Sequence, residues 1–116
     1  MYLHIDYGDQ NERFASCLPR DGKVVSKPLC SDSKLDWYLV RLDKDIEYNG
    51  VLYSHFLLAS RWKGYFIGDN QPVPVFILLV PPDQSVIPDG FSYNQFHFVA
   101  WGTASVIPDQ SLTNGN

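Results

Sequence analysis

Aromatic and polar side chains alternate over residues 91–101, the segment of this sequence with the richest recognition chemistry. Successive side chains of a strand point to opposite faces, so one face of an extended segment here carries Phe96, Phe98 and Ala100. The other face carries Tyr93, Gln95, His97, Val99 and Trp101. Tyrosine and tryptophan bury a large area and keep a polar group. We therefore expect this second face to be accessible and to contact a protein partner, a second copy of the chain or a ligand. The alternative is a second packed face with His97 hydrogen-bonded inside.

A second candidate binding segment covers residues 61–65. It holds the last two cations of the chain, Arg61 and Lys63, interleaved with the aromatic residues Trp62 and Tyr65. Arginine and lysine bind anions, and aromatic rings stack on planar groups, so these residue types suit an anionic small-molecule ligand. The alternative is a turn in which Trp62 packs against the end of the domain while the two cations face water.

Nucleophilic and metal-binding chemistry has little local support. The chain has two cysteines, Cys17 and Cys30, and three histidines, His4, His55 and His97. A cysteine–histidine pair can form in space alone, yet no motif of a common enzyme class accompanies these residues. No two histidines lie at the short spacings typical of metal sites. We therefore predict no catalytic residues, no metal and no cofactor, and two free, mostly buried thiols.

The charge distribution argues against nucleic acid as a partner. Nine basic and thirteen acidic side chains give a net charge of −4, and no basic residue follows Lys63. A sequence-independent nucleic-acid binder needs a basic stripe that releases counterions from phosphate. The acidic segment 43–47, with Asp43, Asp45 and Glu47 around Lys44, either meets a basic partner or is the solvated tip of a hairpin.

The apolar segments give no sign of membrane insertion. The first residues lack the basic and apolar regions of a signal peptide. The longest apolar run, residues 75–80, is much shorter than a helix that spans a bilayer. We expect a cytoplasmic protein without membrane contact.

Short runs of β-branched and aromatic residues, broken repeatedly by Gly, Pro, Asn and Asp, favour an all-β fold. We predict strands over residues 2–7, 13–18, 37–42, 51–59, 65–67, 75–80 and 91–101, turns at 21–22 and 43–45, and a loop over 30–34. Asn49-Gly50 is the preferred pair for a two-residue hairpin, which would place Tyr48 opposite Val51. The same register would place residue 46 opposite residue 53. Residues 75–80 are apolar throughout, so we place them in the middle of the sheet or barrel.

These elements predict one domain over residues 1–109, a small barrel or sandwich of short antiparallel strands with at most one short helix, and a polar tail over 110–116. The pattern is compatible in shape with SH3-like, OB-like or PUA-like barrels, which host unrelated functions. The missing catalytic motifs, the aromatic richness and the acidic second half favour a non-enzymatic binding or protein-interaction domain. Such a domain is an inhibitor, an immunity-type partner protein or an oligomer subunit, with a homodimer as the simplest assembly. The alternative is a small ligand-binding barrel or an enzyme that uses His97 or residues 61–65.

Overall fold

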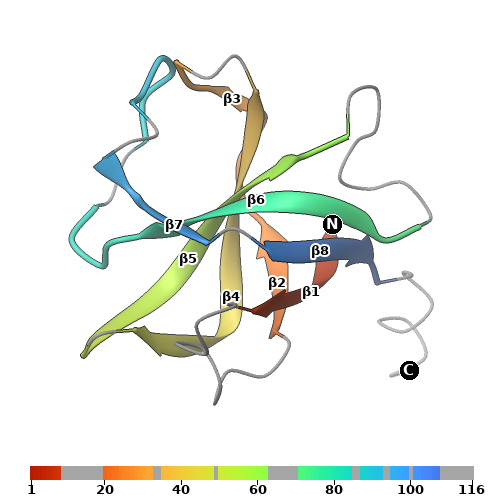
Figure 1. Ribbon diagram of the computed structural model, residues 1–116. Coiled ribbons are helices and arrows are strands. Elements are labelled where there is room, and N and C mark those ends of the chain that lie inside the picture. Colours follow the sequence, from red (N-terminus) through yellow and green to blue (C-terminus); the bar gives the residue numbers. More distant parts are fainter. Residues whose placement is uncertain are drawn as a thin grey trace.

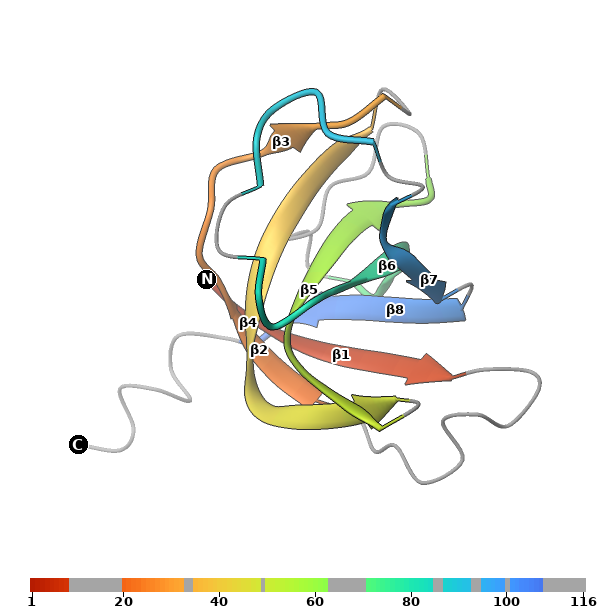
Figure 2. The same cartoon turned by 90° about the vertical axis from the view of Figure 1, so that its left-hand side faces the viewer.

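The strand order closes the chain into a barrel. A computed structural model describes residues 1–8, 20–32, 35–48, 50–62, 71–84, 87–92, 95–99 and 101–107. Six strands pair antiparallel in the order β2-β1-β8-β6-β5-β4, and β2 pairs with β4 to complete the circle (Figures 1 and 2). Their bounds are β1 Tyr2–Gly8, β2 Arg20–Val24, β4 Asp36–Tyr48, β5 Val51–Ser60, β6 Val73–Val80 and β8 Trp101–Val106. Two short strands complete the sheet: β3 (Leu29–Cys30) pairs with β4 outside the barrel, and β7 (His97–Val99) pairs with β6.

The predicted all-β fold is confirmed, and a closed barrel replaces the open choice between barrel and sandwich. None of the described residues lies in an α-helix. Within the same part of the chain, no helix is long and apolar enough to cross a membrane. The predicted strands over residues 13–18 and 65–67 and the tail over 110–116 lie outside the described residues.

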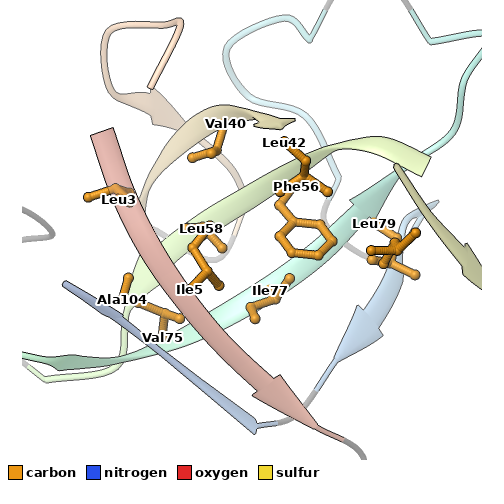
Figure 3. Packing of buried hydrophobic residues seen from close by; sticks show 11 residues of the cluster. Leu3, Ile5, Val40, Leu42, Phe56, Leu58, Val75, Ile77, Leu79 and Ala104 are labelled. Carbon is orange, nitrogen blue, oxygen red and sulfur yellow. The ribbon is translucent and has the colours of Figure 1, made fainter. Parts of the chain in front are cut away.

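The barrel lumen is filled by one apolar cluster, which we call the inner cluster. It contains Leu3, Ile5, Val40, Leu42, Ile46, Phe56, Leu58, Val75, Ile77, Leu79 and Ala104, all buried. Alternate residues of β1, β4, β5 and β6 supply it, as the two-residue period of a strand requires. Figure 3 shows these side chains converging between β1 on one side and β5 and β6 on the other.

A second apolar cluster covers the outside of β4, β5 and β6, and we call it the outer cluster. It contains Leu29, Trp37, Leu57, Ala59, Leu78, Val80, Phe91 and Phe96. Strands with apolar residues on both faces need a cover on each side, and here Leu29 of β3 together with Ile87, Phe91 and Phe96 supplies it. The rings of Trp37 and Phe91 meet edge to face, with centroids 6.3 Å apart. The predicted burial of residues 75–80 on both faces of the sheet is therefore confirmed.

The hairpin between β4 and β5 has the predicted register. Tyr48 lies opposite Val51, and Ile46 lies opposite Tyr53. Gly50 has a φ of 80°, a conformation that glycine adopts without steric penalty. Asn49 lies outside the described residues.

The predicted turn at residues 43–45 is wrong, because β4 runs through it. Arg41 lies opposite His55, and the next pair is Ile46 with Tyr53, so four residues of β4 oppose Ser54 alone. The polar residues interrupt the pairing as a bulge without reversing the chain, and a bulge bends its strand. Figure 2 shows the lower end of β4 turning beneath the barrel. The bend brings Ile46 into the inner cluster.

The predicted turn at residues 21–22 is also wrong, because both residues lie inside β2. Gly22 pairs with Leu3 on one side and with Leu42 on the other. A Cβ atom on Gly22 would lie 2.6 Å from Val40 Cγ1 and 2.9 Å from the Arg41 carbonyl oxygen. Gly22 is therefore needed because β2 and β4 approach closely here. A glycine in the sequence does not by itself show whether it lies in a turn or at such a close approach.

The predicted strand over residues 91–101 is interrupted. Phe91 makes a single parallel bridge to Ser31, and the Gln95 N–H donates to the Ser92 carbonyl in a turn. Among the described residues of this segment, only β7 and β8 are strands. Their register on β6 shifts by one residue between the pair Ile77–Val99 and the pair Pro74–Thr103, as it does at a bulge.

The predicted loop over residues 30–34 is wrong at its start, because Cys30 belongs to β3. Its side chain is a free, exposed thiol, so the expectation of a buried thiol is wrong for this cysteine. Cys17 lies outside the described residues. The strand β3 is held against the segment after Pro88, since the Gly90 N–H donates to the Cys30 carbonyl at 2.7 Å.

Candidate functional site

A pocket of about 200 Å³ opens on the outside of the barrel, where β6 leaves the side of β5. We call it the His55 pocket. It is lined by Leu39, Ser54, His55, Val80, Pro81, Pro82, Gln84 and Ile87. Leu39, Val80 and Ile87 also pack in or against the outer cluster, so the pocket has an apolar floor at the margin of that cluster. Ser54, His55 and Gln84 add the polar groups.

The two prolines after β6 create the pocket. Val80 makes the last pair with β5, opposite His55. Proline has no N–H to donate to a ladder, so the chain leaves the sheet at Pro81. A turn follows, in which the Gln84 N–H donates to the Pro81 carbonyl at 3.0 Å. This turn brings Gln84 back to the wall of the pocket.

His55 lies in the middle of a row that crosses three strands. Arg41 on β4 and Val80 on β6 are its direct partners. Burial lowers the pKa of the imidazole, the Arg41 guanidinium lowers it further, and Asp45 acts in the opposite direction. The imidazole is therefore neutral at pH 7. The Ser54 hydroxyl and His55 Nδ1 share a hydrogen bond of 2.8 Å.

No protein-family model, no curated protein and no solved structure matches this chain. Pockets for drug-sized ligands usually exceed about 300 Å³, and the His55 pocket is smaller. It suits one side chain of a binding partner, which would rest on the apolar floor with a neutral imidazole and a hydroxyl at its edge.

The contact face predicted from residues 93–101 does not lie on one continuous strand. Placing Tyr93, Gln95, His97 and Trp101 on one face required an unbroken strand, whereas β7 and β8 are separated by a bulge and Gln95 precedes both. Gln95 is exposed. His97 and Trp101 are described only by their backbone pairing, and Tyr93 lies outside the described residues. The contact face stays a prediction.

The second predicted segment is described at two of its four site residues. The guanidinium of Arg61 lies over the ring of Phe76, 5.3 Å from its centroid. Phe76 packs against the outer cluster, so Arg61 covers the edge of that cluster as long cations commonly do. Trp62 is 44 % exposed. Lys63 and Tyr65 lie outside the described residues, and anion binding here stays a prediction.

His4 and Cys30, the other described residues considered for metal binding or nucleophilic chemistry, both lie beside carboxylates. His4 Nδ1 lies 2.8 Å from Asp21 Oδ1, and His4 Nε2 lies 3.5 Å from Asp6 Oδ2. Each carboxylate meets a different ring nitrogen, which does not make a common metal site. Partial desolvation and the carboxylate of Asp36 raise the pKa of the Cys30 thiol, which disfavours the nucleophilic thiolate. Among the described residues, no group of three or more His, Cys, Asp or Glu could hold a metal ion.

The acidic segment lies along β4 and not at the hairpin tip. Asp43, Lys44, Asp45 and Glu47 are all exposed. Asp43 to Asp45 fall in the bulge, and Glu47 lies opposite Leu52 near the end of the hairpin. Sequence analysis found this segment but missed the pocket beside it. The available signal was Pro81-Pro82, which follows a fully apolar strand and forces the chain away from its neighbour.

Proposed function

We propose that this protein is a non-enzymatic interaction domain that binds a protein partner through the His55 pocket. The observation that carries the proposal is the build of the pocket, which has an apolar floor, a few polar groups and room for one side chain. Binding energy in protein interfaces concentrates where an anchor side chain fills a desolvated pocket. The pocket is formed by the sheet on one side and by the turn of Pro81 to Gln84 on the other.

The packing of the barrel supports binding on the outside. The inner cluster fills the lumen with side chains from all sides (Figure 3). Small barrels with filled interiors bind at their surfaces or loops, whereas ligand-binding barrels of the lipocalin kind keep a cavity inside. A ligand or partner of this protein would therefore be recognised at the surface, where the His55 pocket lies.

The proposal can be tested with a library of random twelve-residue peptides displayed on phage and selected on the full chain. We expect selected peptides to bind saturably. The same substitution at two histidines then provides a matched pair, because His55→Gln alters the pocket while His4→Gln alters an exposed residue of β1. Binding should weaken about tenfold in His55→Gln, the effect of losing a well-placed anchor contact, and stay unchanged in His4→Gln.

Two results would overturn the proposal. One is a selection that yields no saturable binder at all. The other is a set of binders with equal affinity for the wild type, His55→Gln and His4→Gln, because these peptides would then bind elsewhere. Circular dichroism and thermal unfolding of each variant separate a lost contact from a lost fold.

A hydrolase is the second candidate, favoured by the hydrogen bond between the Ser54 hydroxyl and His55 Nδ1. A neutral histidine in contact with a serine is half of a nucleophilic arrangement. A fluorophosphonate probe tests it directly, because such a probe labels only activated serines. Labelling of the wild type that is lost in both Ser54→Ala and His55→Gln would support the hydrolase, and an unlabelled wild type would reject it.

A further inference from the structure

The lower part of β5 is paired on one side only. Residues 51–53 pair with β4, and Ser54 lies opposite the bulge. On the other side, pairing with β6 begins at His55, opposite Val80, and continues toward Ser60. Among the described residues, no strand pairs with residues 51–54 on that side. Within the described part of the chain, this stretch of β5 is therefore an edge in an otherwise closed barrel.

The edge exists because of the same two prolines that form the pocket. If β6 kept its register on β5, Pro81 would lie opposite Ser54 and Pro82 would lie opposite Tyr53. Neither residue has an N–H to give to the ladder. The chain leaves the sheet here, so the edge and the His55 pocket are adjacent, and Ser54 belongs to both.

We propose that the β5 edge at residues 51–54 accepts an extended segment of a partner protein as an added strand, with one apolar side chain of that segment in the His55 pocket. This inference rests on the proposed interaction function and specifies its binding mode. In strand addition, main-chain hydrogen bonds supply affinity and a pocket for one side chain supplies specificity. The edge and the pocket offer these two elements side by side.

The charges around the edge indicate the chemistry of the partner. Three exposed acids, Asp43, Asp45 and Glu47, stand on β4 against two exposed cations, Arg41 and Lys44, so this part of the strand carries a net negative charge. Leu52, which is 56 % exposed, lies opposite Glu47. A lysine or arginine on the added strand can lay its stem over Leu52 and place its charge near Glu47. We therefore assign the occupant as a basic extended segment with an apolar anchor.

The same charges disfavour a second copy of this chain at the edge. Pairing two β5 edges would leave the two acidic β4 segments separated by both β5 strands, so neither segment would meet an opposite charge. A basic partner gains from the acidic segment, whereas a second copy brings more acids than cations to it. A peptide-reversible dimer of the chain in sedimentation measurements would overturn this assignment.

The test uses a peptide selected from the phage library on the wild-type chain. Each backbone amide of the peptide is N-methylated in turn, which removes one hydrogen-bond donor and leaves every side chain in place. An added strand turns alternate amides toward β5, so we expect losses of about tenfold at every second position. The intervening positions should tolerate methylation.

Charge variants of the protein provide the second arm. Glu47→Lys should weaken the peptide severalfold at low salt, and the effect should shrink at high salt. Asp36→Lys makes the same charge change at the other end of β4 and should leave binding unchanged. Equal effects of the two variants would contradict the assigned position of the partner.

The outcomes separate this inference from the proposed function. A peptide that depends on His55 but shows no alternation under N-methylation binds the pocket without adding a strand, so the inference fails and the interaction function stands. A phage selection that yields no binders contradicts both the strand-addition inference and the proposed interaction function. Alternating losses together with dependence on His55 and Glu47 are the expected result.

Discussion

Replacing Gly22 by alanine should destabilise the protein, although a general rule predicts the opposite. Glycine inside a strand usually weakens it, and alanine in its place would gain about 0.5–1 kcal/mol from the lower entropy of the unfolded chain. At Gly22, however, an added Cβ would lie 2.6 Å from Val40 Cγ1 and 2.9 Å from the Arg41 carbonyl oxygen. One of these neighbours is backbone of β4, which is held by pairing on both of its sides.

The magnitude follows from two opposing terms. Overpacking a filled site costs about 1–3 kcal/mol, and the backbone contact places Gly22 toward the upper end of that range. After the entropic gain, we expect a net loss of about 1–2 kcal/mol. A domain of 116 residues has an unfolding entropy of about 0.24 kcal/mol/K. The midpoint of thermal unfolding should therefore fall by about 4–8 °C.

A double-mutant cycle with Val40 tests the cause as well as the size. Val40→Ala removes the methyl group nearest to the new Cβ and by itself destabilises the inner cluster. If steric conflict is the reason, the two substitutions should not be additive, because contacting residues couple. The double variant Gly22→Ala/Val40→Ala should then lose about 1 kcal/mol less free energy of unfolding than the two single variants lose together. Additive losses, or a higher melting midpoint in Gly22→Ala, would refute the reasoning.

Four further outcomes are expected. Gly50→Val should lower stability by about 1–3 kcal/mol because its φ of 80° resists a β-branched residue; an unchanged melting midpoint would contradict this conformation. Ile77 is fully buried, so Ile77→Ala should lower the free energy of unfolding by about 2–5 kcal/mol in urea unfolding. A loss below about 1 kcal/mol, roughly that of a surface change, would contradict its place in the core. Ser31→Ala removes the acceptor of the buried Trp37 Nε1–H bond of 2.8 Å and should cost about 1–3 kcal/mol, visible as an earlier thermal transition. Folding lowers the pKa of His55 from 6.5, so its contribution to stability is complete above pH 6.5 and is lost as the pH falls through the lower pKa of the folded state. The melting midpoint of His55→Gln should accordingly fall less between pH 7 and pH 5 than that of the wild type, and parallel curves would reject the shift.

Local patterns predicted the parts of the fold that local chemistry decides. The Asn49-Gly50 pair fixed the register of its hairpin, because only a tight turn with positive φ fits between two β-forming runs. The apolar run in β6 predicted burial on both faces, since no polar residue marks a solvent side. In these two places the preference of the residues and the tertiary structure agree.

The two wrong turn predictions, at residues 21–22 and 43–45, share one physical origin. Asp43 and Gly22 belong to residue types that form turns, and the same types also form bulges and close strand approaches inside a sheet. Which of these occurs depends on neighbours that are distant in sequence. For Gly22 the neighbour is Val40, and for the acidic segment it is the need to bring Ile46 over the end of the barrel.

The His55 pocket could not be predicted from sequence because its lining comes from three separate stretches of chain. Leu39 belongs to β4, Ser54 belongs to β5, and Gln84 follows β6. A histidine within a strand carries no signal of its own, since most such residues are simply packed or solvated. Only the closed order of the strands shows that β5 continues past the point where β6 ends.

Two irregularities of this barrel, the bulge in β4 and the prolines after β6, both lie beside residues 51–54 of β5. The bulge in β4 bends the hairpin beneath the barrel and displays its acids, while the prolines after β6 release the edge of β5. A closed barrel normally removes its edges and the risk of pairing with other chains. Here Pro81 and Pro82 deprive the chain of amide donors that pairing with β5 would use, and the proposed strand addition assigns the edge that remains to another chain.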